Sequence, residues 1–282
     1  MIPTLGEDIA QFLTNSEDLE FEEEIARNPY KLKAWWRYLQ AKRGASRKAR
    51  NILHERALHF LPRSYKLWRQ YLGERVAAVA DKSVDDPACQ IVVNAFERAL
   101  VHLHKMPRLW LDYTAFLARL QRGTATRRAY DRALQALAIT QHHLVWPQYL
   151  EWVRAFGALE TAVRVYRRYL MLDGARREEY VDYLESSGLW GEAARQLARC
   201  VNDDSFVSAA GHSKHQMWMR LCDICAQHPA DVSGALKVDA IIRSGISRFT
   251  DEVGRLWAKL ADYYIRLGQL ERARDVYEEA IN

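Results

Sequence analysis

The chain has 282 residues, more than one compact hydrophobic core normally holds, so its length predicts two domains or an elongated array. Hydrophobic residues make up 49% and charged residues 27%, which excludes a disordered chain, and 13 Gly and 7 Pro disfavour a many-stranded β protein. The four Cys are irregularly spaced, which does not suit a disulfide framework. The chain shows neither a basic start followed by an apolar segment nor an apolar run near the ~20 residues that cross a bilayer. These features indicate a reducing compartment, the cytosol or nucleus.

The chain begins with an acidic segment, residues 1–28. Residues 1–26 carry eight acidic side chains and no Lys or Arg, so the net charge of +5 leaves +13 for the rest of the chain. We expect a capping helix that ends at Asn28-Pro29. A cover for a basic face of the same chain and a peptide bound by a partner are the alternatives.

A Trp-x-x-Tyr signature recurs every 33 to 42 residues after this segment. Residues at positions i and i+3 share one face of a helix, and large aromatic side chains at this spacing fill the space between helices, so they are expected to form the structural core. Tyr replaces Trp in the fifth copy, and Leu replaces the last Tyr in the sixth and seventh. The expected core residues are Trp35, Tyr38, Trp68, Tyr71, Trp110, Tyr113, Trp146, Tyr149, Tyr180, Tyr183, Trp218 and Trp257.

A second signature, Glu-Arg-Ala-Leu, follows the first at residues 55–58 and 97–100, and as Asp-Arg-Ala-Leu at 131–134, with weaker copies later. We expect its arginines, Arg56, Arg98 and Arg132, to pair with nearby carboxylates or helix ends. Pro62 and Pro107 are expected to close the first two units. Glycines that tolerate φ > 0 are expected in the turns between the two signatures, at Gly44, Gly123, Gly157, Gly188 and Gly268.

Each unit is therefore predicted to be a helix, a turn and a second helix, which gives an all-α fold: an α-solenoid superhelix of about seven antiparallel helix pairs. We assign the first five repeats to residues 29–201, an irregular connection and flexure to 202–214, and two further repeats to 215–282. Residues 80–87 are expected to be a loop between helices. The last repeat shows no polar capping helix, so we expect an array truncated at its C-terminus.

Basic side chains gather around the predicted turns, where a stripe of them would contact phosphates or an acidic protein. The alternative is a solvated helix face. The candidate residues that face a partner or RNA are Lys42, Arg43, Arg47, Lys48, Arg119, Arg122, Arg127, Arg128, Arg164, Arg167, Arg168, Arg176 and Arg177.

One set of residues, His212 and His215 with Cys222 and Cys225, has side chains that zinc accepts. The two cysteines fall on the predicted helix of Trp218, however, where a free Cys is a common small core residue, so we expect no metal site. The sequence also lacks the GxxxxGK[ST], HExxH and GxSxG motifs. We therefore expect no catalytic residues, no cofactor, no small-molecule substrate and no enzyme activity.

The paired signatures resemble the half-a-TPR (HAT) repeat of RNA-processing factors. An ordinary tetratricopeptide array has a similar period, but its Gly and Ala positions fall in a different register, and it does not need the repeated Glu-Arg-Ala-Leu. Five segments look like the N-terminal half of the SYF-type splicing factors, which are called xeroderma pigmentosum group A-binding proteins in animals: residues 21–29, 61–68, 104–113, 238–243 and 260–266.

The resemblance implies a nuclear scaffold of the Prp-nineteen-associated complex in the spliceosome, with a role in mRNA splicing and, in animals, a link to transcription-coupled repair. The implied partners are other HAT and coiled-coil subunits, with snRNA or pre-mRNA as a further contact and no membrane. The alternative is an RNA-binding HAT protein of 3′-end processing or rRNA maturation.

Overall fold

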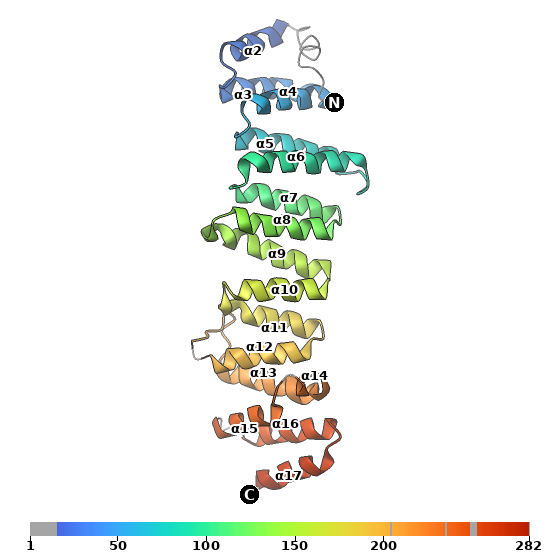
Figure 1. The fold of residues 1–282 in the computed structure, drawn as a ribbon, viewed down its shortest axis with the longest axis vertical. Coiled ribbons are helices and arrows are strands. Elements are labelled where there is room, and N and C mark those ends of the chain that lie inside the picture. Colours follow the sequence, from blue (N-terminus) through green and yellow to red (C-terminus); the bar gives the residue numbers. More distant parts are fainter. Residues whose placement is uncertain (1–15, 204, 235, 249–252, 282) are drawn as a thin grey trace. The chain divides into compact units, whose positions relative to one another are not determined.

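The computed structural model describes residues 16–203, 205–234, 236–248 and 253–281 (Figure 1). Sixteen α-helices and three short 3-10 helices account for the regular structure of these residues, which contain no strand. None of these helices is long and apolar enough to cross a membrane. The first fifteen residues of the acidic segment lie outside the described residues.

The chain divides into two compact units, Met1–Trp152 and Val153–Asn282. The first unit begins with α2, and its helices then follow in pairs joined by short connections, each packing on its neighbours in the sequence. Its helices are α2 (Ser16–Arg27), α3 (Leu32–Ala41), α4 (Arg47–Phe60), α5 (Tyr65–Ala78), α6 (Pro87–Leu103), α7 (Pro107–Arg119), α8 (Gly123–Ala136) and α9 (His142–Phe156), which continues into the second unit. Short 3-10 helices follow α3 at Lys42–Gly44 and α8 at Ile139–Gln141.

The second unit continues the same arrangement, with one interruption. Its helices are α10 (Leu159–Leu170), α11 (Arg177–Ser186), α12 (Trp190–Asn202), α13 (Lys214–Gln227), α14 (Pro229–Ser233), α15 (Val238–Arg248), α16 (Val253–Arg266) and α17 (Leu270–Ile281), and a 3-10 helix at Gly174–Arg176 precedes α11. In the sixth repeat a short helix, α14, precedes the second helix, α15, and packs on both α12 and α13.

The predicted fold class is confirmed: the described residues form successive helix pairs of the HAT type, as in an α-solenoid. The boundaries assigned at 201 and 214 stay a prediction. Residues 203–213, which connect α12 to α13, lie within the second compact unit.

Ten of the twelve expected core aromatics are buried, and Trp35, Tyr38, Tyr71, Tyr149 and Tyr180 have no exposed surface. Tyr183 and Trp257 differ from the expectation, because both are only half-buried. Other side chains on the same helices occupy the core. They are Tyr180, Val181 and Leu184 in α11, and Leu256 and Leu260 in α16.

The turns within the helix pairs use glycine as predicted at three places. Gly157, Gly188 and Gly268 have φ between +72° and +75°, where side chains with a Cβ are strained. The expectation was wrong for Gly44, which lies in the Lys42–Gly44 3-10 helix, and for Gly123, which is the first residue of α8. In that turn Gln121 takes the positive φ of 55° instead.

The long connection between α5 and α6 is a loop, as the insertion at residues 80–87 predicted. Its end is defined by Asp86, whose carboxylate accepts a 2.7 Å hydrogen bond from the backbone N–H of Ala88, and by Pro87 as the first helical residue. Pro62 follows α4 as expected, whereas Pro107 begins α7 and does not close the helix before it.

Candidate functional site

In the first three repeats the signature Trp side chain anchors the first helix to the turn before it. In each of them the indole N–H donates to the backbone carbonyl six residues earlier, which lies in the connection to the previous repeat. The bonds run from Trp35 to Pro29 (2.7 Å), from Trp68 to Pro62 (2.9 Å) and from Trp110 to His104 (2.8 Å). These Trp side chains are therefore buried in the core, and their indole N–H groups also hold the connection that leads into the helix.

The arginines of the second signature join neighbouring repeats. Each guanidinium pairs with the glutamate at the equivalent place in the preceding repeat and lies over the Trp ring of its own repeat, at 5.3 to 5.7 Å from the ring centroid. The pairs are Arg56–Glu22 (2.7 Å), Arg98–Glu55 (2.6 Å) and Arg132–Glu97 (2.7 Å). Arg56, Arg98 and Arg132 thus pair with carboxylates as expected, but the partners lie 34 to 43 residues earlier in the chain, so the expected local pairing was wrong.

The signature Tyr hydroxyls reach the same acidic residues. Tyr71 donates to Glu55 at 2.5 Å and Tyr113 to Glu97 at 2.6 Å. Tyr149 donates to Asp131, the equivalent acidic residue of the third repeat, at 3.2 Å. Glu55 and Glu97 therefore each accept hydrogen bonds from the Tyr and the Arg of the following repeat, which specifies how one helix pair sits on the next.

A further ring, not expected from the sequence, packs at five of these junctions. The residue just before the acidic or Arg position packs its ring against a Tyr of the following helix, with ring centroids 4.5 to 5.3 Å apart. In the His54–Tyr71 pair the rings are tilted by 38°. The stacked pairs are Phe21–Tyr38, Phe96–Tyr113, Tyr130–Tyr149 and Tyr166–Tyr180. The sequence does contain a signal for these contacts, because an aromatic or His residue recurs just before the second signature.

These junctions make stability depend on pH in a predictable direction. The hydrogen bond from Arg132 holds the pKa of Glu97 below its usual value of 4.5. A carboxylate whose folded pKa is depressed stabilises the fold above its unfolded pKa, and that contribution disappears as the pH falls through the folded pKa.

We therefore expect Glu97→Gln to lower the free energy of unfolding near neutral pH by roughly 0.5–1 kcal/mol, since the pair is partly exposed. The difference from the wild type should shrink steadily below pH 4.5. Urea unfolding at several pH values measures it. A difference that stays constant down to acidic pH would show that the ion pair contributes nothing.

Several predicted partner-facing basic residues are engaged within the chain. Lys42 pairs with buried Asp18 at 2.5 Å, and Arg122 donates to the Gln90 side chain at 2.6 Å. In the second unit, ion pairs hold three arginines: Arg164 to Glu160 (3.6 Å), Arg167 to Glu192 (3.0 Å) and Arg176 to Glu179 (3.1 Å). The Arg177 guanidinium lies 6.0 Å from the Phe206 ring centroid, and Arg168 is exposed on α10.

A second group of basic residues is available to a partner. Arg43, Arg47 and Lys48 are exposed around the start of α4, and Arg127 and Arg128 lie on α8. None of these five side chains forms an ion pair with a residue that the structure describes.

The predicted basic residues do not all lie at equivalent places. Arg43 and Arg122 lie at the turn between the two helices of a repeat. Arg176 ends the 3-10 helix in the connection between repeats, and Arg177 is the first residue of α11. The stripe expected from the sequence therefore separates into clusters at two kinds of turn.

The His and Cys residues considered for zinc are placed differently from one another. Cys222 and Cys225 are buried in α13, and burial raises the pKa of each thiol to about 12. His212 lies outside that helix, with its Nδ1 atom 3.3 Å from the Glu178 carboxylate. Among the described residues, no group of three or more His, Cys, Asp and Glu side chains is arranged to hold a metal ion.

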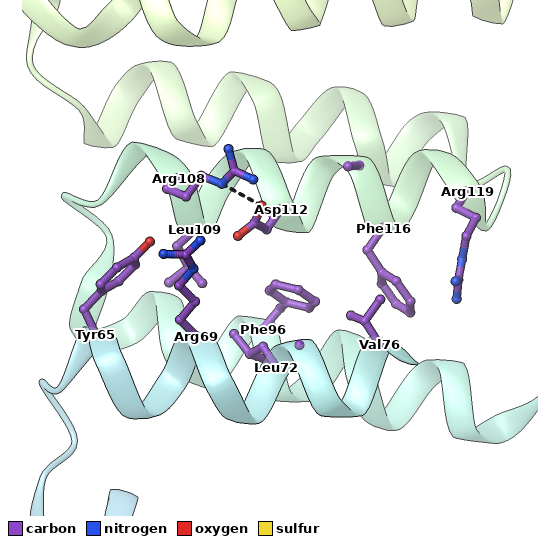
Figure 2. Close-up of a pocket in the computed structure, with 12 residues that line it drawn as sticks. Tyr65, Arg69, Leu72, Val76, Phe96, Arg108, Leu109, Asp112, Phe116 and Arg119 are labelled. Carbon is purple, nitrogen blue, oxygen red and sulfur yellow. Dashed lines mark ion pairs between the residues drawn. The ribbon is translucent and has the colours of Figure 1, made fainter. Parts of the chain in front are cut away.

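A pocket of about 440 Å³ opens between α5 and α7, the first helices of the second and third repeats. Figure 2 shows apolar side chains in its middle and arginines at both ends. It is therefore a candidate place for a partner to contact the first unit.

Comparison with known families identifies the array. Residues 17–175 match the model of the N-terminal HAT repeats of the pre-mRNA-splicing factors Syf1/CNRKL1, and residues 177–282 match the model of the middle HAT repeats of pre-mRNA-splicing factor SYF1. The chain belongs to the SYF1 family.

The similarity to SYF1 proteins extends from animals to yeast. Over 94% of its length the chain is 56% identical to pre-mRNA-splicing factor SYF1 of Homo sapiens and 52% identical to the syf1 homologue of Drosophila melanogaster. Over 96% it is 40% identical to pre-mRNA-splicing factor cwf3 of Schizosaccharomyces pombe. The aligned regions cover 31%, 30% and 34% of these relatives, so the chain spans about a third of their length.

The SYF1 assignment confirms the predicted HAT repeats and the resemblance to SYF-type splicing factors. The chain is thus a HAT-repeat homologue of a splicing factor. The Trp, Tyr, Glu and Arg residues described above make the contacts within and between its repeats.

Proposed function

We propose that this chain is a protein-interaction scaffold of the spliceosome, that it acts in the nucleus within the Prp-nineteen-associated complex, and that it performs no catalysis. One observation carries the proposal. The repeated aromatic and charged residues contact one another at the repeat junctions, so the exposed side chains between them are what a partner meets.

The proposed mechanism is geometric. Each helix pair holds its exposed side chains at a set position relative to the next pair, because the junction contacts specify how the pairs pack. Arg43, Arg47 and Lys48 form one basic cluster and Arg127 and Arg128 another, and both suit acidic partner surfaces.

Co-purification from nuclear extract tests the scaffold proposal. We expect the tagged chain to recover subunits of the Prp-nineteen-associated complex, and Arg127→Glu with Arg128→Glu to recover less of them, because the substitutions reverse two charges that have no partner in the described residues. Arg274→Glu, in an exposed pair with Glu278 on α17, is the matched control. Recovery of 3′-end-processing or nucleolar factors in place of splicing proteins would contradict the proposal.

Direct RNA contact is the second candidate, because the same five basic side chains are suited to phosphates. If they bind RNA, gel-shift affinity for single-stranded RNA should fall steeply as salt rises from low to physiological concentration. The double charge reversal at Arg127 and Arg128 should flatten that dependence. Affinity that barely changes with salt would exclude phosphate contact.

A further inference from the structure

The pocket between α5 and α7 has walls that run in the same direction. In Figure 2, Arg69 and Arg108 lie near one end of the pocket and Arg119 near the other, with Phe96 from α6 between them. A groove flanked by two parallel helices offers an extended surface, long enough for more than one side chain of a bound segment.

Small residues keep the middle of this groove open. Gly73 on α5 and Ala115 on α7 are both exposed and both line the pocket. A Cβ atom added at Gly73 would meet no atom within 4 Å, so packing does not require glycine there. Glycine inside a helix lowers stability by about 0.5–1 kcal/mol relative to alanine. A glycine beside the pocket, where packing would allow a larger residue, therefore points to a role in keeping the pocket open.

The inner surface of the pocket is apolar. Leu72, Leu109 and Phe116 line it and are almost fully buried, and Val76 lines it half-buried. The ring of Phe96 is only 2% exposed, so it offers no free face on which a nucleic-acid base could stack. An aliphatic or aromatic side chain suits this surface better than a base.

The rim of the pocket is positively charged. Three arginines, Arg69, Arg108 and Arg119, face one aspartate, Asp112, which pairs with Arg108 at 3.0 Å. Arg69 is exposed and forms no ion pair with any residue in the described part of the chain. Arg119 lies 5.0 Å from the centroid of the Phe116 ring and donates to the Val79 carbonyl. Once the Arg108–Asp112 pair is counted, one positive charge that the described residues do not compensate remains at each end of the pocket, on Arg69 and on Arg119.

We propose that this pocket binds an acidic peptide segment of a protein partner, with one apolar side chain inserted between Gly73 and Ala115 and carboxylates placed on Arg69 and Arg119 at its two ends. The inference rests on the proposed scaffold function and names the chemistry of one of its partners. Charge complementarity places the segment in the groove, and the inserted side chain supplies apolar burial.

Selection from a random peptide library against the immobilised chain tests the proposal without assuming a partner. The enriched peptides should carry Phe, Trp, Leu or Ile flanked by Asp and Glu. Measured by fluorescence polarisation, their affinity should fall at least about tenfold with Gly73→Leu, which fills the groove, and with Arg69→Glu, which replaces a positive charge of the rim by a negative one.

Two matched variants serve as controls, since Ala77 is exposed on the same helix and Arg63 is exposed just before it, and neither lines the pocket. Ala77→Leu and Arg63→Glu should retain the affinity to within about twofold. Gly73→Leu should leave the helical circular dichroism intact and the thermal midpoint unchanged or higher, because leucine favours a helix more than glycine does.

Three outcomes would overturn the proposal: no enrichment, enrichment of peptides without acidic residues, or affinity unaffected by Gly73→Leu. Displacement of the selected peptides by single-stranded RNA, with RNA binding that Gly73→Leu also abolishes, would assign the pocket to nucleic acid instead. Failure here is distinguishable from failure of the scaffold function. If the peptide experiment fails but the wild-type chain still recovers splicing proteins from nuclear extract, the scaffold function is supported and only the role of this pocket is rejected.

Discussion

Replacing Trp110 with Ala is expected to lower the free energy of unfolding by about 3–5 kcal/mol, the range for large aromatic truncations in a core. The Trp110 side chain is only 2% exposed, its indole N–H donates to the His104 carbonyl at 2.8 Å, and Arg132 lies over its ring. The substitution therefore leaves a cavity and also an unpaired carbonyl at the entry to α7. Urea unfolding followed by circular dichroism measures the change.

Trp36 provides the control, because it neighbours Trp35 in the sequence but is only half-buried, with the Lys66 ammonium 3.7 Å from the ring centroid. Trp36→Ala should cost clearly less, about 1 kcal/mol. Equal losses for the two variants, or an unchanged midpoint for Trp110→Ala, would show that the signature Trp is not a packing residue.

Replacing Gly245 with Ala is the second large effect that we expect. Gly245 lies in α15, where an added Cβ atom would overlap the Trp218 indole and stand 2.9 Å from its Cε2 atom. The ring is 3% exposed and has little room to move, so overpacking should cost about 1–3 kcal/mol. The thermal midpoint of the variant, read against that of the wild type, gives the result.

The matched control is Gly73→Ala, the same change inside another helix, where the new Cβ atom meets nothing within 4 Å. This variant should be more stable than the wild type by about 0.4–1 kcal/mol, because alanine restricts the unfolded chain. A stabilised Gly245→Ala variant would mean that α15 and α13 do not pack as closely as described.

The helix pairs could be predicted because their determinants repeat. Aromatic residues at i and i+3 specify which face of each helix is buried, and seven copies make coincidence implausible. Tyr183 and Trp257 were misplaced for the same reason. Repetition implied equivalent burial, whereas in α11 and α16 neighbouring side chains such as Val181 and Leu256 fill the core.

The turns were harder to predict, because glycine is neither necessary nor sufficient for a positive φ. Gln121 takes this conformation in the third repeat although Gly123 stands two residues later. The helix α14 also escaped prediction, since its five residues are too few to show any periodicity.

The candidate surfaces required the structure because ion pairs depend on which helices become neighbours. Lys42 and Arg47 look alike in the sequence, yet Lys42 pairs with Asp18, 24 residues earlier, while Arg47 forms no ion pair with the described residues. The pocket combines Arg69 with Arg108 from two different repeats. Arg69 occupies an unspecified position of its Trp-x-x-Tyr copy and Arg108 lies outside both signatures, so repetition marks neither arginine.

The central claim is that repeated residues build the array while unrepeated exposed residues bind partners. Arg132 tests it most directly, because it is repeated and yet its side chain is 48% exposed. Arg132→Gln and Arg128→Gln, one turn apart on α8, are compared in two assays: urea unfolding, and recovery of splicing proteins from nuclear extract at low temperature. We predict that Arg132→Gln lowers the urea midpoint of unfolding and leaves the recovery of splicing proteins unchanged. Arg128→Gln should leave the midpoint unchanged and lower the recovery. Loss of splicing proteins with Arg132→Gln at unchanged stability would contradict the account.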